Sequence, residues 1–248
     1  MRKIVTIVLI CVLVAVACVS GYKIFQIMSE YQTGENTYGD LRRYVTYSTW
    51  SKRDSKKSKE PNTAKTSIDF EGLSAINSDI VGWIKLDGSV IDYPVVKCDN
   101  NDYYLEHLFD KQVNSSGCIF LDCRNSSDFF SRNSVIYGHH MKNGSMFSAI
   151  TNYKNQSFYD EHPLFQLYTP NANYEVEIFA GYVADLQDNA WNTDFVNDDD
   201  FLKWLDERFQ KSVFQSDVRP AADDKIVTLS TCSYDFDNAR FVVFGVIH

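Results

Sequence analysis

Hydrophobic residues change along this chain from one continuous run to short alternating segments. The continuous run extends from Ile4 to Tyr22, nineteen residues without a charge. A helix of that length spans roughly 28 Å at 1.5 Å per residue, close to the ~30 Å hydrocarbon core of a bilayer. Arg2 and Lys3 precede the run, and positive charges favour the inner side of a membrane. The pattern predicts a single-pass membrane helix with its N-terminus inside and the rest of the chain outside.

The same segment fits two other interpretations. Ala15-Val16-Ala17 resembles the cleavage site of a secretory signal peptide, and Cys18 resembles the cysteine of a lipoprotein. An uncleaved anchor over residues 1–28 is favoured because the apolar stretch is long for a signal peptide. It also continues through residues 24–28 with four further apolar side chains.

Residues 29–66 connect this segment to the rest of the chain. Leu41, Tyr44 and Val45 have helical spacing and predict a helix over Tyr38 to Thr49. Residues 51–65, SKRDSKKSKEPNTAK, are charged and polar without any periodicity. This composition predicts a basic linker, either a solvated tether or a contact for anionic lipid or wall polymers.

Residues 67–248 form the predicted globular body, which begins with a helix and continues mainly as strands. The apolar residues Leu73, Ile76, Ile80 and Val81 predict a short helix that Asp69 caps. From Gly82 the pattern alternates, and it breaks at Asp87-Gly88, a pair typical of a hairpin turn. Further strands are predicted at 118–123, 134–140, 164–169, 174–184, 225–232 and 240–247.

Two helices are predicted among these strands. Ser145 to Ile150 has helical spacing, and Phe201 to Phe209 is amphipathic, with Phe201, Leu202, Leu205 and Phe209 on its apolar side. The acidic run 197–200 precedes this second helix. Consecutive acids lack the alternating spacing of a calcium loop, so they are interpreted as a helix start. Many short strands with few helices predict a mixed β-barrel.

Composition narrows the functional class. The chain has 248 residues, 44% of them hydrophobic, and a net charge of -9. Residues 1–65 carry eleven Lys and Arg against five Asp and Glu, whereas residues 66–248 carry thirteen against twenty-eight. An acidic body does not suit nucleic-acid binding, which requires neutralisation of phosphates. The six cysteines include no CxxC pair and no zinc-site spacing. Cys98, Cys118 and Cys123 are predicted to be buried apolar residues.

The candidate chemistry lies at the ends of three predicted strands. Side chains alternate along a strand, so Ser230 and Cys232 should share one face. Arg240 opens the next strand, and the apolar run before Gly138 presents His139. A thiol becomes a strong nucleophile as a thiolate, which a nearby imidazole or guanidinium favours. An alternative for Arg240 is a surface ion pair with Asp235 or Asp237.

Five short motifs surround these residues: IDYPVV (91–96), NDYYL (101–105), GCIFLD (117–122), GHHMKNGSMF (138–147) and TLSTC (228–232) with the downstream arginine. They resemble motifs of the sortases, the cysteine transpeptidases of Gram-positive cell surfaces, and of class B in particular. The resemblance runs from about Ile68 to the C-terminus. It implies an eight-stranded β-barrel with an N-terminal helix and a helix in the connection before the cysteine strand.

The resemblance also implies a role for each candidate. Cys232 would be the nucleophile, and Arg240 would hold the substrate carbonyl or stabilise the oxyanion. His139, the histidine that follows the glycine of the motif, would act as acid and then as base, in preference to His140. Class B enzymes bind their substrate peptide with positions that match Asn101, Leu105, Tyr137 and Ser230 here. No metal or organic cofactor is implied.

The implied reaction cleaves a C-terminal sorting signal after Thr, often of the form NPxTx, and joins the secreted protein to a peptidoglycan precursor amine. Ser233 departs from class B members that carry an acidic residue after the cysteine, and the loop before Arg240 is short. Both departures affect peptide specificity. The alternatives are a pilin-polymerising sortase, a hydrolytic cysteine peptidase and a non-catalytic, anchored binding domain.

Overall fold

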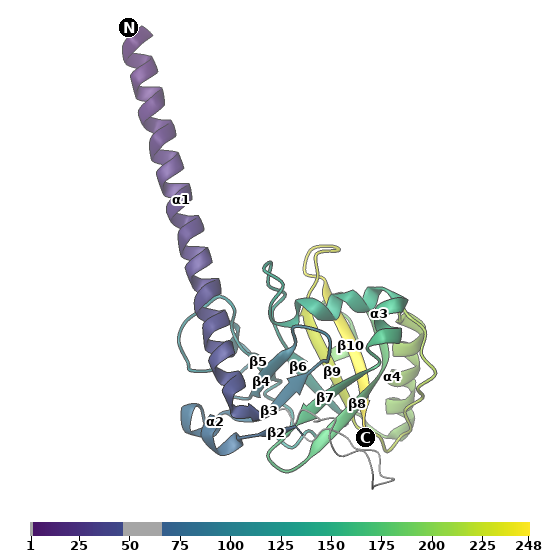
Figure 1. The fold of residues 1–248 in the computed structure, drawn as a ribbon. Helices are drawn as coiled ribbons and strands as arrows, with labels where there is room; N and C mark the ends of the chain where they lie inside the picture. Colours follow the sequence, from purple (N-terminus) through teal and green to yellow (C-terminus); the bar gives the residue numbers. More distant parts are fainter. Residues whose placement is uncertain (1, 47–65) are drawn as a thin grey trace, which may run out of the picture.

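The computed structural model describes residues 2–46 and 66–248. A long N-terminal helix leads into a closed barrel that carries further helices on its outside (Figure 1). The basic stretch 51–65 and residues 47–49 of the helix predicted at Tyr38 to Thr49 lie outside the described residues.

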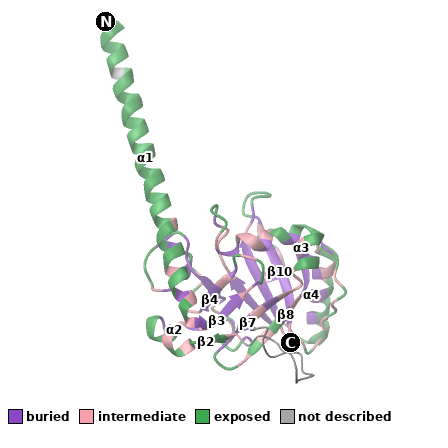
Figure 2. Cartoon of the chain, in the orientation of Figure 1, coloured by how far each residue is buried: buried purple, intermediate pink, exposed green. Residues whose placement is uncertain are grey.

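Helix α1 (Arg2–Leu41) is continuous, and in the described part of the chain one helical stretch, Arg2 to Tyr44, is long and apolar enough to cross a membrane. The side chains described for residues 2–30 are exposed (Figure 2). The helix predicted at Tyr38 to Thr49 is confirmed only as far as Leu41, where α1 ends, and a 3-10 turn η1 (Arg42–Tyr44) follows. Strand β1 (Val45–Thr46) then pairs with β2 (Ser67–Ile68). The side chain of Val45, a β-branched residue that favours strands, is buried against the body.

The barrel has eight strands, in the order β10-β8-β7-β3-β4-β5-β6-β9. The pairs β4–β5 and β6–β9 are parallel, and the other pairs are antiparallel. This confirms the predicted eight-stranded barrel. The strands are β3 (Ile80–Lys85), β4 (Asp92–Val96), β5 (Ile119–Leu121), β6 (Asn133–Tyr137), β7 (Leu164–Tyr168), β8 (Asn173–Ala184), β9 (Ile226–Cys232) and β10 (Arg240–Ile247).

The first elements of the body confirm the predicted cap and hairpin but shorten the predicted helix. The Asp69 side chain accepts a hydrogen bond from the Gly72 N–H at the start of α2 (Phe70–Ile76). Ile80 and Val81 belong to β3 and not to this helix, because Ile80 pairs with Val96 across the hairpin. Gly88 turns that hairpin with φ +76°, a conformation that glycine adopts without strain.

Helix α4 (Asp198–Lys211) occupies the long connection between β8 and β9, as predicted. The Asn197 side chain accepts from the Asp200 N–H, so the acidic run is a capped helix start. The predicted apolar face is confirmed for Phe201 and Leu205, but Leu202 is 40% exposed and Phe209 is half-buried. Trp204 and Arg208 are buried on this helix as well. Tyr182 of β8 and Phe244 of β10 lie against the Arg208 guanidinium, and these rings offer it cation–π contacts.

Two buried clusters hold the body together. One fills the barrel and includes Leu229 and Val243, and the other lies between α4 and the outer faces of β8 and β10. Cys118 is fully buried, as predicted, but Cys98 and Cys123 are only half-buried because both follow strands at the barrel rim. All six cysteines are free thiols. The remaining helices are η2 (Tyr103–Leu105), η3 (Phe147–Lys154), α3 (Gln156–Glu161) and η4 (Asn189–Trp191).

Candidate active site

Strand register brings the three candidate groups to one end of the barrel. Arg240 lies directly opposite Cys232 in the β9–β10 pair, so both side chains stand on the same face. The parallel pair β6–β9 places Tyr137 beside Ser230. The Gly138 N–H then donates to the Ser230 carbonyl at 3.1 Å, which leads the chain to His139 at the same edge.

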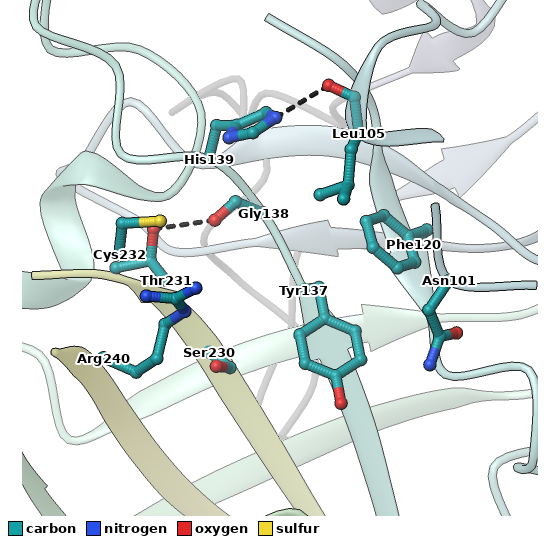
Figure 3. A pocket seen from close by; sticks show the side chains of 10 residues that line it. All are labelled: Asn101, Leu105, Phe120, Tyr137, Gly138, His139, Ser230, Thr231, Cys232 and Arg240. Carbon is teal, nitrogen blue, oxygen red and sulfur yellow. Dashed lines mark hydrogen bonds between the residues drawn. The ribbon is translucent and has the colours of Figure 1, made fainter. Parts of the chain in front are cut away.

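A pocket of about 230 Å³ opens at this edge (Figure 3). The structure brings together all seven residues singled out in the sequence, and it adds Phe120, Gly138 and Thr231. Phe120 was hidden in a run of apolar strand residues. Thr231 lies between Ser230 and Cys232 in β9, and its hydroxyl donates to the Gly138 carbonyl at 2.7 Å. The pocket is lined by Asn101, Leu105, Phe120, Tyr137, Gly138, His139, Ser230, Thr231, Cys232 and Arg240.

The charges around Cys232 favour its thiolate. The adjacent His139 ring lowers the pKa of Cys232, and the positive charge of Arg240 lowers it further, against the opposing effect of burial. In turn, Cys232 raises the pKa of His139, although burial of the ring and Arg240 oppose this. The two shifts favour a thiolate beside an imidazolium.

One ring nitrogen of His139 is fixed by the backbone. His139 Nε2 lies 2.7 Å from the Leu105 carbonyl oxygen (Figure 3). A carbonyl oxygen only accepts hydrogen bonds, so Nε2 carries the proton and donates it. Nδ1 is therefore the ring nitrogen that remains for proton exchange at the thiol. His140 has another partner: its Nδ1 lies 3.1 Å from the backbone carbonyl of Cys232.

A glycine allows the Leu105 carbonyl to reach this position. Gly117 has φ +56°, and a Cβ atom there would lie 2.5 Å from the Tyr104 oxygen, 2.8 Å from the Leu105 oxygen and 3.1 Å from the His139 ring. Any side chain at this position would push the Leu105 carbonyl away from His139.

The Arg240 guanidinium is held by its own strand end. Its Nη1 donates to the carbonyl oxygens of Asn238 and Ala239, at 3.2 and 3.1 Å. The predicted alternative, a surface ion pair, is wrong among the described residues: Asp235 pairs with Lys154 at 2.5 Å, and neither Asp235 nor Asp237 pairs with Arg240. Within residues 2–46 and 66–248, no hydrogen bond is found for the other guanidinium nitrogens, which can donate to a ligand in the pocket.

A polar network supports the wall opposite Cys232. The Tyr137 hydroxyl donates to Asp122 at 2.9 Å, and Arg124 donates to both carboxylate oxygens of Asp122. Burial alone would raise the pKa of Asp122, but the hydrogen bonds from Arg124 hold this pKa below its usual value. The Trp191 indole donates to the Ser230 hydroxyl at 3.0 Å. Sequence reasoning missed Asp122 and Trp191, since Trp191 reaches the pocket from a connection 39 residues away from Ser230.

The chain and its fold are similar to those of known proteins. The family model for the sortase domain matches residues 84–248. Sortase B of Staphylococcus aureus strain NCTC 8325 is 36% identical over 249 residues, covering 100% of this chain and 98% of that protein. The structure of an S. aureus sortase B–substrate complex has a TM-score of 0.69 and 39% identity, covering 72% of this chain and 84% of that chain. Sortase B of Bacillus anthracis in complex with AAEK1 has a TM-score of 0.75 and 29% identity, covering 89% of this chain and 99% of that chain.

Proposed function

Because this chain belongs to the sortase family, as a class B member and a cysteine transpeptidase, we propose that Cys232, His139 and Arg240 carry its chemistry. The observation that carries the proposal is their convergence in one pocket, where the pKa of Cys232 is lowered mainly by His139. A thiolate, a proton donor and a fixed cation are the three groups that acyl transfer from a peptide requires.

In the first half of the reaction, the Cys232 thiolate attacks the carbonyl carbon of the Thr in a sorting signal. The C–S bond forms and the carbonyl becomes an oxyanion, to which the free N–H groups of Arg240 donate. His139 gives a proton to the departing amine as the C–N bond breaks. A thioacyl enzyme remains, and the C-terminal fragment leaves with a neutral amine.

In the second half, His139 takes a proton from an incoming amine. That amine attacks the thioacyl carbon, a new amide bond forms and the Cys232 thiolate is released. Substrate and amine binding are supported by the family, and we propose that the amine belongs to a peptidoglycan precursor. Asn101, Leu105, Tyr137 and Ser230 are proposed to bind the sorting peptide, because they line the same pocket as the thiol.

We further propose that residues 1–28 anchor the protein as a single-pass membrane segment with the catalytic domain, residues 67–248, outside. The apolar helix and the two basic residues before it support this topology. Ser233 provides no carboxylate beside the thiol, so any contribution of an acidic residue there is missing from this protein.

Mass spectrometry of the full chain in detergent tests the proposal. We expect a peptide library built on NPxTx to leave an acyl adduct on Cys232, absent in Cys232→Ala and retained in Cys123→Ala, a matched half-buried thiol. Added peptide amine should convert the adduct into a ligated product. Release by water alone would instead indicate a hydrolase, and a lysine side chain as the preferred acceptor would indicate pilin polymerisation. Absence of both adduct and cleavage across the library would favour a non-catalytic binding domain.

A further inference from the structure

The last part of α1 is docked on the barrel and is not a free spacer. Tyr38 and Leu41 are 3% and 4% exposed, whereas the described side chains of the first 30 residues are exposed. Gly34 is buried where the helix crosses the loop 113–117, and a Cβ there would lie 3.0 Å from the Ser116 hydroxyl. The helix and the loop therefore approach so closely that a side chain at position 34 would require Ser116 to shift.

Hydrogen bonds tie the helix to that loop along three turns. Asn114 Nδ2 donates to the Glu30 carbonyl at 2.9 Å, and the Ser115 hydroxyl donates to the Glu30 carboxylate at 2.7 Å. Further along, the buried Tyr38 hydroxyl donates to the Gly117 carbonyl. Loop 113–117 is thus held from its middle to its end.

A second set of contacts reaches the segment that follows His139. Asn143 Nδ2 donates to the Glu35 carboxylate at 3.2 Å. The Tyr38 ring packs edge-on against Tyr93, with centroids 5.2 Å apart, and the Tyr93 hydroxyl accepts from the Met146 N–H at 3.1 Å. The next N–H, from Phe147, donates to the His139 carbonyl at 2.9 Å.

Tyr38 is therefore connected to His139 by two short routes. One passes from the Tyr38 hydroxyl through Gly117 to the Leu105 carbonyl, against which Gly117 is tightly packed and to which His139 Nε2 is bonded. The other passes through the Tyr93 ring to the backbone of residues 146–147. Both routes constrain the ring that faces the thiol.

We propose that Tyr38, together with the membrane-proximal turns of α1, is a positioning residue for His139. The docked helix holds the Leu105 carbonyl in place, and that carbonyl keeps the His139 ring in the tautomer and orientation that present Nδ1 to Cys232. This inference rests on the proposed role of His139. It makes the same helix that carries the membrane anchor a part of the support of the active site, because the helix is continuous from Arg2 to Leu41.

The matched pair Tyr38→Phe and Tyr31→Phe tests this in the full chain in detergent. Each substitution removes one hydroxyl from α1 and keeps the ring, and Tyr31 lies two turns before Tyr38. The readouts are the pH profile of iodoacetamide alkylation of Cys232, followed by peptide mass mapping, and kcat and KM for a sorting peptide.

For Tyr38→Phe we expect the alkylation midpoint of Cys232 to move to higher pH. We also expect kcat to fall about tenfold with KM unchanged, since a small misplacement of a catalytic group is costly. Tyr31→Phe should match the parent chain. Thermal unfolding is measured in parallel, and a lower Tm with an unchanged alkylation profile would mean that Tyr38 is only structural and would overturn the inference.

His139→Ala separates this inference from the function on which it rests. If His139→Ala shifts the alkylation profile and Tyr38→Phe does not, then Tyr38 does not position His139, while the proposed chemistry stands. If His139→Ala leaves both the alkylation profile and kcat unchanged, the proposed role of His139 fails, and the role of Tyr38 fails with it.

Discussion

At the scale of single residues, the proposed chemistry depends on Cys232, His139 and Arg240, and the protonation of the first two is coupled. The thiol of Cys232 loses its proton more readily beside His139 and Arg240, and His139 holds its proton more tightly beside the thiol. The two titrations are coupled, so activity should follow two apparent pKa values. These values belong to the pair and not to either residue alone.

The first prediction concerns pH. The value of kcat/KM should rise with pH as the thiol ionises, and fall as His139 loses the proton that the leaving amine needs. Arg240 lowers the pKa of both partners, so Arg240→Gln should shift both limbs of the profile to higher pH. The maximum should also fall by about 10²-fold, because an oxyanion donor is lost.

Measurement of kcat/KM between pH 5 and 10 checks the shift. Lys154→Gln is the control: this cation lies at the same rim, but it is paired with Asp235. If Arg240→Gln lowers the maximum kcat/KM without moving either apparent pKa, then Arg240 acts on the carbonyl and not on the thiol.

The second prediction separates the two neighbouring histidines. His139→Gln should lower the rate of thioacyl formation by about 10²-fold or more, the usual range for loss of a general acid. His140→Gln should change it by only a few-fold, because the His140 ring contacts the Cys232 carbonyl and not the thiol. Single-turnover measurements distinguish them, and equal losses in both variants would contradict the assignment.

At the scale of elements, the sequence predicted strands better than helix faces. Alternation marks the half-buried strands directly, so the hairpin at Asp87-Gly88 and the final pair of strands were predictable. The face of α4 was not, because a buried Arg208 reads as polar in any hydrophobic pattern. The helix predicted beyond Leu41 failed because tertiary pairing of Val45 with Ile68 outweighed local spacing.

The candidate site shows a similar division. Cys232 and Arg240 were predictable from strand register, since their separation places them opposite each other. Asp122 and Trp191 were not predictable, because an acid at a strand end and a tryptophan in a long connection have no local pattern that indicates a pocket. The position of Trp191 depends on how the β8–β9 connection folds back over the barrel, which sequence spacing does not encode.

The third prediction follows from that connection. Arg208 is fully buried, its Nη2 lies 2.5 Å from the Asn189 side chain, and its guanidinium lies 4.9 Å from the Trp204 ring. Arg208→Gln should lower the free energy of unfolding by about 1–3 kcal/mol, since the Asn189 side-chain oxygen loses a buried hydrogen-bond donor. Activity should fall as well, because Asn189 belongs to the turn that carries Trp191 to Ser230.

Denaturant unfolding measures this cost, with Lys203→Gln on the exposed side of α4 as the control. The control should change stability by no more than about 0.5 kcal/mol. A similar small change in Arg208→Gln would mean that the aromatic rings and not the cation hold α4 to the barrel.

At the scale of the whole molecule, the apolar helix α1 and the candidate active site are oriented together. The N-terminal part of α1 and the loop between β9 and β10 extend from the same side of the barrel (Figure 1). Cys232 ends β9 and Arg240 begins β10, so the pocket opens beside that loop. An anchored protein would therefore hold its pocket on the side where the helix enters the membrane, near substrates that are themselves held at the membrane.

The last prediction tests the topology. In intact cells, a membrane-impermeant maleimide should label Val113→Cys, placed in a Cys232→Ala background, because Val113 is 77% exposed on the body. Cys11 and Cys18 should stay unlabelled, since both lie within the apolar span. The background without Val113→Cys measures labelling of Cys98 and Cys123.

Replacing Arg2 and Lys3 by Gln while introducing Gln26→Lys and Ser29→Lys reverses the charge bias, and labelling of Val113→Cys should then fall. If the Val113→Cys chain with Arg2 and Lys3 unchanged is labelled only after lysis, the body lies inside the cell, where a transpeptidase of surface proteins has no substrate.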